Sequence, residues 1–225
     1  MRGISKAVLA KAYMIQKVQG MTVNDFVKIK YLSHACFEFK DGKTILIDPY
    51  FKGNTLAPSY SGKPDLVLVT HEHHDHNDAE RFDCTIVCPQ TCKFEKAQTM
   101  RVGDAKTIEG VKIEMISASH HQSVYATGYI FEFEGKRVCH LGDTYLDGVK
   151  KLDNIDILLV PIGGYYTMNM DEAIKALKII GPELTIPMHY NTFQEIKASP
   201  DEFKKKAEKQ GFKVTVMKIG EEIAV

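Results

Sequence analysis

The sequence predicts a layered α/β fold in which two β-sheets pack against each other and helices lie outside them. Short apolar segments of strand length dominate the first 160 residues, and helical periodicity appears only late in the chain. The 225 residues contain no internal linker rich in Pro, Gly or Ser, so they suffice for one sizeable core. Two groups of strands interleaved with helices suit such a layered arrangement.

The expected strands begin with a meander. Its three strands are expected at residues 27–32, 35–39 and 44–47. The turn Asp41-Gly42 joins the last two of these strands. A continuous apolar run at 66–69 predicts a fully buried strand, which leads directly into a histidine-rich segment.

Strands continue to dominate the chain until two helices appear near its end. Further strands are expected at residues 85–88, 111–116, 128–133, 137–141 and 157–160. A helix at 170–180 is indicated by its apolar face, its acidic first turn and the Gly181-Pro182 pair that follows it. A second helix begins at Ser199-Pro200 and stops at Gly211, and residues 213–218 alternate as a closing strand.

The first 20 residues differ from the rest of the chain. They are basic, no acidic residue precedes Asp25, and their apolar residues fall near helical spacing. We interpret residues 1–20 as an N-terminal extension of a single domain at 21–225. A surface-seeking amphipathic helix is the alternative interpretation.

Composition excludes several classes of protein. Lys+Arg and Asp+Glu balance at 29 each, so the chain lacks the basic footprint of a dedicated nucleic-acid binder. The five cysteines are odd in number and no secretory signal is visible, which favours reduced thiols in the cytoplasm. They lack the second pair that a structural zinc site needs. No run is long enough to span a membrane. We expect a cytoplasmic protein acting on a small molecule, and self-association is left open.

The segment Thr70 to His76, THEHHDH, contains four of the nine histidines of the chain. In an extended loop, positions i and i+2 project to the same side, so His71 and His73 can bind one metal ion together. Asp75 and His76 can then face a second ion. Glu72 and His74 are expected to point away from the ions.

Three further apolar runs end in residues of the ligand type. They are followed by Ser119-His120-His121, Gly142-Asp143-Thr144 and Met188-His189-Tyr190. A lone histidine at a strand end is more often an ordinary polar residue than a ligand. Together with the histidine-rich motif, however, these residues favour a dinuclear metal site, in which His121 is the alternative to His120.

These motifs resemble the metallo-β-lactamase superfamily of metal-dependent hydrolases. The resemblance extends from about Val27 to Val225, and it rests on the strand that ends in Asp48, the motif at 70–76, His120, the segment 142–144 and His189. The segments 33–35, 160–163 and 187–193 are most similar to the ascorbate-6-phosphate lactonase-like branch, and in particular to the metal-dependent hydrolases of that branch.

The resemblance implies a four-layer αβ/βα sandwich with two metal ions at one edge of the sheets. It assigns His71, His73 and His120 to the first ion, Asp75, His76 and His189 to the second, and Asp143 to a bridge between them. Asp48 would anchor residues 70–76, here called the metal loop, through hydrogen bonds that orient its histidines. Imidazole and carboxylate ligands suit zinc first, with manganese, iron or nickel as alternatives.

Two ions about 3.5 to 4 Å apart can share a hydroxide that acts as a nucleophile. The predicted activity is therefore hydrolysis of an ester, lactone or phosphodiester bond in a small, phosphorylated substrate. Asp75 and His34 are the catalytic candidates, and His34 would contact the substrate or assist its leaving group. A nuclease or RNA-processing phosphodiesterase is the alternative function.

Overall fold

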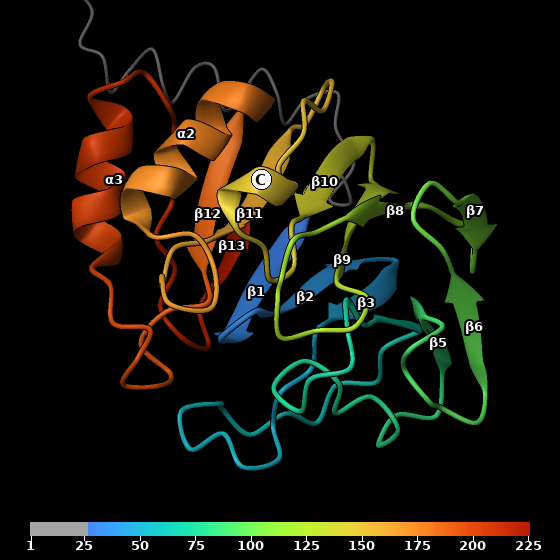
Figure 1. Cartoon of the computed structure of the whole chain (residues 1–225). Coiled ribbons are helices and arrows are strands. Elements are labelled where there is room, and N and C mark those ends of the chain that lie inside the picture. Colours follow the sequence, from blue (N-terminus) through green and yellow to red (C-terminus); the bar gives the residue numbers. More distant parts are fainter. Residues whose placement is uncertain (1–26) are drawn as a thin grey trace, which may run out of the picture.

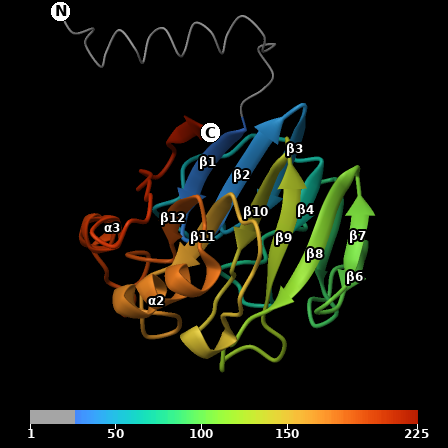
Figure 2. The same ribbon diagram turned by 90° about the horizontal axis from the view of Figure 1, so that it is seen from above.

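The computed structural model describes residues 27–225, which form two β-sheets packed face to face (Figure 1). The strand order is β13-β1-β2-β3-β4-β5-β6 in the seven-stranded sheet and β12-β11-β10-β9-β8-β7 in the six-stranded sheet. In the view from above, the six-stranded sheet lies over the seven-stranded sheet (Figure 2). No helix among the described residues is long and apolar enough to cross a membrane.

The seven-stranded sheet combines an antiparallel and a parallel part. Its strands are β1 (Lys28–Ser33), β2 (Cys36–Asp41), β3 (Lys43–Ile47), β4 (Leu66–Leu68), β5 (Thr85–Pro89), β6 (Ala97–Met100) and β13 (Glu222–Ala224). Strands β1 to β3 form the predicted antiparallel meander, whereas β3 to β6 run parallel to one another. The segments that follow β3 and β4 therefore leave the sheet at the same edge.

The six-stranded sheet has the same mixed character. Its strands are β7 (Ala105–Ile108), β8 (Val111–Ser117), β9 (Thr127–Phe133), β10 (Lys136–His140), β11 (Ile157–Pro161) and β12 (Leu184–Met188). Strands β10, β11 and β12 are parallel, and β8 has the same direction because β9 is antiparallel to both β8 and β10. The segments after β8, β10 and β12 consequently reach one common edge.

The core between the sheets is built from alternate residues of their strands. Phe37 and Phe39 of β2 are fully buried and face the second sheet, where the ring of Phe131 lies 5.0 Å from that of Phe39. Burying each such side chain stabilises the fold by about 1.5–3 kcal/mol. This core fixes the relative position of the two sheets and hence of the loops at their edges.

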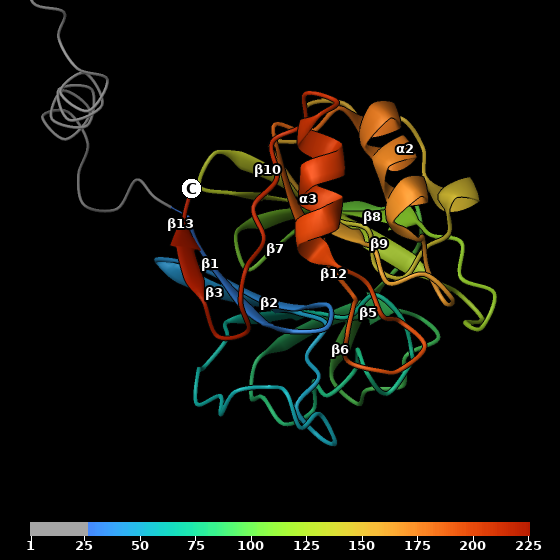
Figure 3. The same ribbon diagram turned by 90° about the vertical axis from the view of Figure 1, so that its left-hand side faces the viewer.

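Helices cover the outer face of the six-stranded sheet (Figure 3). They are α2 (Met170–Ile180), α3 (Pro200–Glu208) and the short 3-10 helix η1 (Leu146–Gly148). Helix α2 matches its predicted bounds because its signals are local: the Asn169 side chain caps the N-terminus and Gly181 adopts φ 69° after the last turn. Leu177 of α2 and Phe203 of α3 pack on the sheet with Leu158 of β11.

Loops cover the outer face of the seven-stranded sheet in the part of the chain that is described. Phe51, Tyr60 and Phe82 pack there against the buried side chains of Leu46 and Val67. The rings of Phe51 and Tyr60 stack at 5.1 Å. The predicted layered α/β sandwich is confirmed. Of its four layers, the one outside the seven-stranded sheet consists of loops and not of the helices that an αβ/βα sandwich implies, in the residues that the structure describes.

Two parts of the strand prediction differ from the structure. Residues 213–218 do not form the predicted closing strand, since only Val214 makes an isolated bridge, to Thr185, and the last strand is β13. Strands β6 and β7 were not predicted, because most of their residues are exposed and lack an apolar pattern. Residues 1–20, interpreted as an extension, lie outside the described residues.

Candidate metal centre

Five loops bring polar side chains to the common edge of the two sheets. Asp48 follows β3, His71 follows β4, His120 follows β8, Asp143 follows β10 and His189 follows β12. All five are buried. The strand directions described above place these loops at one edge, so residues that are far apart in the sequence meet there.

The side chains of His71, His73 and His120 form one potential ligand group, with one ring nitrogen of each within 4.8 Å of the others. Nδ1 of His73 lies 3.3 Å from Nε2 of His120. The other nitrogen of His120 is 3.0 Å from the carbonyl oxygen of Tyr166, which orients the ring toward the group. Burial, and next the neighbouring His76, lower the pKa of His71, so its ring is neutral and able to bind a metal.

The Asp143 carboxylate lies in the middle of the histidines. Its Oδ2 atom is 3.0 Å from Nε2 of His189 and 3.9 Å from Nε2 of both His71 and His120. Its Oδ1 atom is 3.4 Å from Nε2 of His76. Burial opposes ionisation of Asp143, but the charges of His189 and His76 outweigh this effect and hold its pKa well below the usual value.

A second potential ligand group contains Asp75, His76, His189 and also His34, with one ligand atom of each within 4.8 Å of the others. The rings of His34 and His189 lie 4.0 Å apart. His34 was predicted to contact the substrate or to assist its leaving group; its side chain is fully buried and is not among the residues that line the pocket described below. It lies instead behind Asp75 and His189.

Asp48 anchors the metal loop, as the resemblance implied. Its Oδ1 atom accepts a hydrogen bond of 2.8 Å from the Thr70 backbone, and its Oδ2 atom accepts one of 2.7 Å from the Thr70 hydroxyl. Oδ2 is also 2.8 Å from Nδ1 of His76. This contact turns the opposite nitrogen of His76 toward Asp143.

Glu72 and His74 belong to neither ligand group, as predicted. The side chain of His74 is 80% exposed. Glu72 instead accepts hydrogen bonds of 3.0 Å from the Ser123 hydroxyl and the Val124 backbone. It thereby ties the metal loop to the segment that carries His120.

Two other histidines near the motifs make contacts outside the ligand groups. His121 is exposed, and its ring packs at 4.8 Å from that of Tyr145, whereas His120 faces the cluster. Both nitrogens of His140 are engaged: Nε2 lies 2.9 Å from the Ala35 carbonyl oxygen and Nδ1 accepts a hydrogen bond from the Gly142 backbone. His140 therefore supports the fold beneath the site.

Several buried polar atoms at the centre have no partner in hydrogen-bonding geometry, even where a carboxylate oxygen lies nearby. They are Nε2 of His34, His71 and His76, Oδ1 of Asp143 and both ring nitrogens of His189. Burying so many polar atoms without partners is costly unless another group satisfies them. Imidazole nitrogens and carboxylate oxygens gathered in this way fit divalent metal ions. The cysteines are absent from such groups in the described part of the chain.

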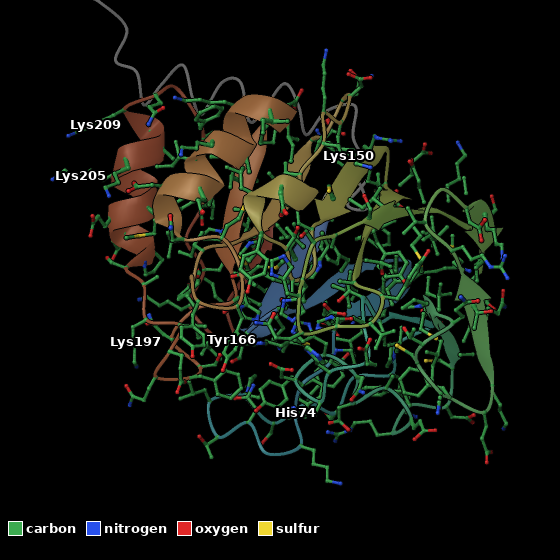
Figure 4. All side chains as sticks on the ribbon, in the orientation of Figure 1. His74, Lys150, Tyr166, Lys197, Lys205 and Lys209 are labelled. Atoms are coloured by element: carbon green, nitrogen blue, oxygen red, sulfur yellow. The ribbon has the colours of Figure 1, made fainter. Side chains whose placement is uncertain are left out.

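A pocket of about 340 Å³ opens onto the centre. It is lined by His73, His74, Asp75, His120, Gln122, Asp143, Tyr166, His189, Phe193 and Glu195. Tyr166 and His74 lie at the same end of the strands in Figure 4. Glu195 was not predicted, and its only sequence signal is its place shortly after the motif that contains His189.

Comparisons with known proteins agree with this geometry. Residues 28–189 match the family model described as beta-lactamase superfamily domain. A UPF0173 metal-dependent hydrolase of Thermoplasma volcanium is 38% identical over 220 residues, covering 88% of this chain and 98% of the relative. A similar hydrolase of Pyrococcus abyssi is 38% identical over 223 residues, covering 88% and 99%.

Among solved structures, the metallo hydrolase Igni18 of Ignicoccus hospitalis superposes with a TM-score of 0.80 and 34% identity, covering 89% of this chain and 98% of its own. These matches confirm the predicted superfamily, although they do not single out the lactonase-like branch. The family model, the relatives and the fold show that the chain belongs to the metallo-β-lactamase superfamily and is a metal-dependent hydrolase.

Proposed function

We propose that the protein hydrolyses an ester, lactone or phosphodiester bond of a small molecule with the help of two divalent ions. The proposed ligands are His71, His73, Asp75, His76, His120, Asp143 and His189. The observation that carries this proposal is the Asp143 carboxylate, which four histidines surround within 3.9 Å at the floor of a pocket.

The proposed ligand set favours zinc. It consists of five imidazoles and two carboxylates, a combination that zinc accepts readily and that manganese, iron and nickel also tolerate. Two bound ions would supply a hydroxide nucleophile at neutral pH and would neutralise charge that develops on the substrate oxygen. Elemental analysis of protein produced without added metal identifies the ion.

The residues of the chain contribute position and charge. Asp48 orients His76 and Tyr166 orients His120, so the two rings are fixed before a substrate arrives. Burial opposes ionisation of Asp75, yet the neighbouring His76 and His34 lower its pKa far below the usual value. A carboxylate of such low basicity is a better ligand than proton acceptor, so we favour the ligand role for Asp75.

The pocket supports a small substrate. Its volume of about 340 Å³ lies at the lower end of the range found for small-molecule sites. Its lining contains no Lys or Arg, whereas a nuclease needs such residues to follow a phosphate backbone. We therefore favour small-molecule hydrolysis over the nuclease alternative.

The test combines metal analysis with a screen of esters, lactones and phosphodiesters. We expect two ions per chain, and turnover that disappears with chelator and returns when the metal is restored. Replacing Asp143 with Ala removes the central carboxylate and should lower turnover on the order of a hundredfold or more. A metal-free preparation that retains full turnover would overturn the proposal.

A matched pair of variants tests the choice between adjacent histidines. His120→Ala should reduce both metal content and turnover, because His120 faces the cluster. His121→Ala should leave both unchanged, because His121 is exposed and packs on Tyr145. The opposite result would assign His121 to the metal.

A further inference from the structure

The charges that line the pocket restrict the kind of substrate it can take. Asp75 and Asp143 would serve as counter-charges for the proposed ions, and the neutral histidines of the site would complete the ligand set without adding charge. The lining residues left for the substrate are His74, Gln122, Tyr166, Phe193 and Glu195. Glu195 is thus the one formal charge in this part of the lining, and it is negative.

The loop that carries Phe193 and Glu195 is held in one shape by Asn191. The Asn191 side chain donates a hydrogen bond of 2.9 Å to the Ala198 carbonyl oxygen and accepts one of 3.2 Å from the Ala198 backbone. The Asn191 backbone N–H donates to the carbonyl oxygen of Ile196, whose side chain is fully buried. The loop is closed on itself, so its position at the pocket is set in advance.

The two lining residues on this loop have different surroundings. The ring of Phe193 packs edge-on against that of His34 at 5.5 Å, which fixes it as an apolar wall. Glu195 is exposed, and no Lys, Arg or His among the described residues lies within ion-pairing distance of its carboxylate. Its charge is therefore available to a bound molecule.

Building on the proposed function, we propose that the pocket selects a small ester or lactone whose non-reacting part is cationic, with Glu195 as the specificity-determining residue. An ammonium group there would pair with Glu195 and could also lie against the aromatic faces of Phe193 and Tyr166. An uncharged group at the same position would make no ion pair with Glu195. A phosphate group outside the scissile bond would face Glu195 without a Lys or Arg, which argues against the phosphorylated substrate expected from the sequence.

The experiment uses the metal-loaded protein and three 4-nitrophenyl esters with the same acyl chain. The chain ends in a trimethylammonium, a tert-butyl or a phosphate group, so that shape is similar and charge differs. We expect kcat/KM to follow the order cation, neutral, anion. The ratio between cation and neutral ester should be roughly threefold or more, as for a partly exposed ion pair.

Variants of Glu195 separate charge from shape. Glu195→Gln should bring the cationic and neutral esters to equal kcat/KM, and Glu195→Lys should reverse the order. Glu134→Lys is the matched control, because Glu134 is an exposed residue in the turn at the opposite end of β10. It should leave the order unchanged. Preference for the anionic ester, or an order that Glu195→Lys does not alter, would overturn the inference while hydrolysis stands.

A binding measurement keeps the two proposals distinguishable. Absence of turnover for all three esters and for the wider screen would overturn the proposed hydrolysis of such bonds. Titration calorimetry with the three matching carboxylic acids then tests the selectivity alone, since the same order of affinity is expected. Equal affinities, no binding at all or tighter binding of the phosphate-bearing acid would contradict the role of Glu195.

Discussion

Nε2 of His34 lies 3.2 Å from Oδ2 of Asp75, although the two residues come from different loops. His34 sits in the turn between β1 and β2 with φ 59°, a left-handed conformation that costs energy for a residue with a side chain. Its carbonyl oxygen accepts a hydrogen bond of 2.8 Å from the His189 backbone, and its Nδ1 atom contacts the Thr192 hydroxyl. His34 thus connects the β1–β2 turn to the loops that carry two proposed ligands.

This relationship predicts that His34 acts through the metal ligands. His34→Gln should loosen Asp75 and His189 and weaken binding of one ion about 10- to 100-fold, as loss of a supporting contact does elsewhere. Elemental analysis after dialysis against a competing chelator measures the effect, and we expect the content to fall from two ions toward one. His121→Ala is the control, because His121 is exposed, packs on Tyr145 and does not line the pocket.

The same variant tests the original expectation for His34. If metal content is unchanged while kcat falls, His34 acts on the substrate or its leaving group, as the sequence first suggested. Its complete burial argues against that outcome in this structure.

A second prediction concerns Glu72, which lies between the proposed ligands His71 and His73. Its carboxylate holds Ser123 and Val124, and the Ser123 backbone in turn donates a hydrogen bond to the carbonyl oxygen of His120. Glu72→Ala should release this segment and lower kcat/KM about tenfold, with a loss of about 1–3 kcal/mol in the free energy of unfolding. Glu72→Gln retains a hydrogen-bond acceptor, so its effect on both quantities should be smaller. Equal kcat/KM for Glu72→Ala and the unaltered protein would contradict this role.

Elements with local signals could be predicted from the sequence. Helix α2 is bounded by the Asn169 cap and Gly181, and both act within a few residues of themselves. The segment 213–218 shows the limit of such reasoning. Val214 and Met217 are buried although no regular strand forms, because an alternating pattern reports burial and does not specify a pairing partner.

The residues of the site also fall into two groups, those that a local sequence pattern predicts and those that only the packed fold brings together. The spacing of His71 and His73 implies a shared ion, since residues two apart face the same side of an extended loop. The approach of His34 to Asp75 depends on how three loops meet after the sheets have packed. Glu195 lies at the pocket because Asn191 closes its loop, and neither residue belongs to a metal-binding pattern.

The buried His140 predicts a dependence of stability on pH. Burial is the main cause that lowers its pKa, while Asp48 and the Ala35 carbonyl oxygen oppose the shift. The folded state therefore favours the neutral ring. The pKa of the ring in the unfolded chain is about 6.5, and above that pH the neutral His140 ring contributes fully to stability. The stabilisation is lost as the pH falls from there through the lowered pKa of His140 in the folded protein.

Urea unfolding of metal-free protein at pH 7.5 and pH 5.5 measures this dependence. The free energy of unfolding should decrease at the lower pH, by about 1.4 kcal/mol for each pKa unit of the shift that is crossed. His140→Gln should be less stable at pH 7.5 but should lose less on acidification, because the titrating group is absent. The same pH dependence in both proteins would show that His140 does not contribute to it.

The last prediction concerns the boundary of the domain. The backbones of Val27 and Val225 are joined by reciprocal hydrogen bonds of 3.2 and 3.0 Å, and β13 pairs with β1, so the described domain closes on itself from residue 27. Deleting residues 1–20 should therefore change the free energy of unfolding by no more than about 0.5 kcal/mol and leave the metal content unaltered. Deleting residues 222–225 is the contrasting change, because it removes β13 and exposes the edge of β1. Thermal unfolding and elemental analysis compare the two, and a loss of soluble protein or of metal after the first deletion would place residues 1–20 within the folded domain.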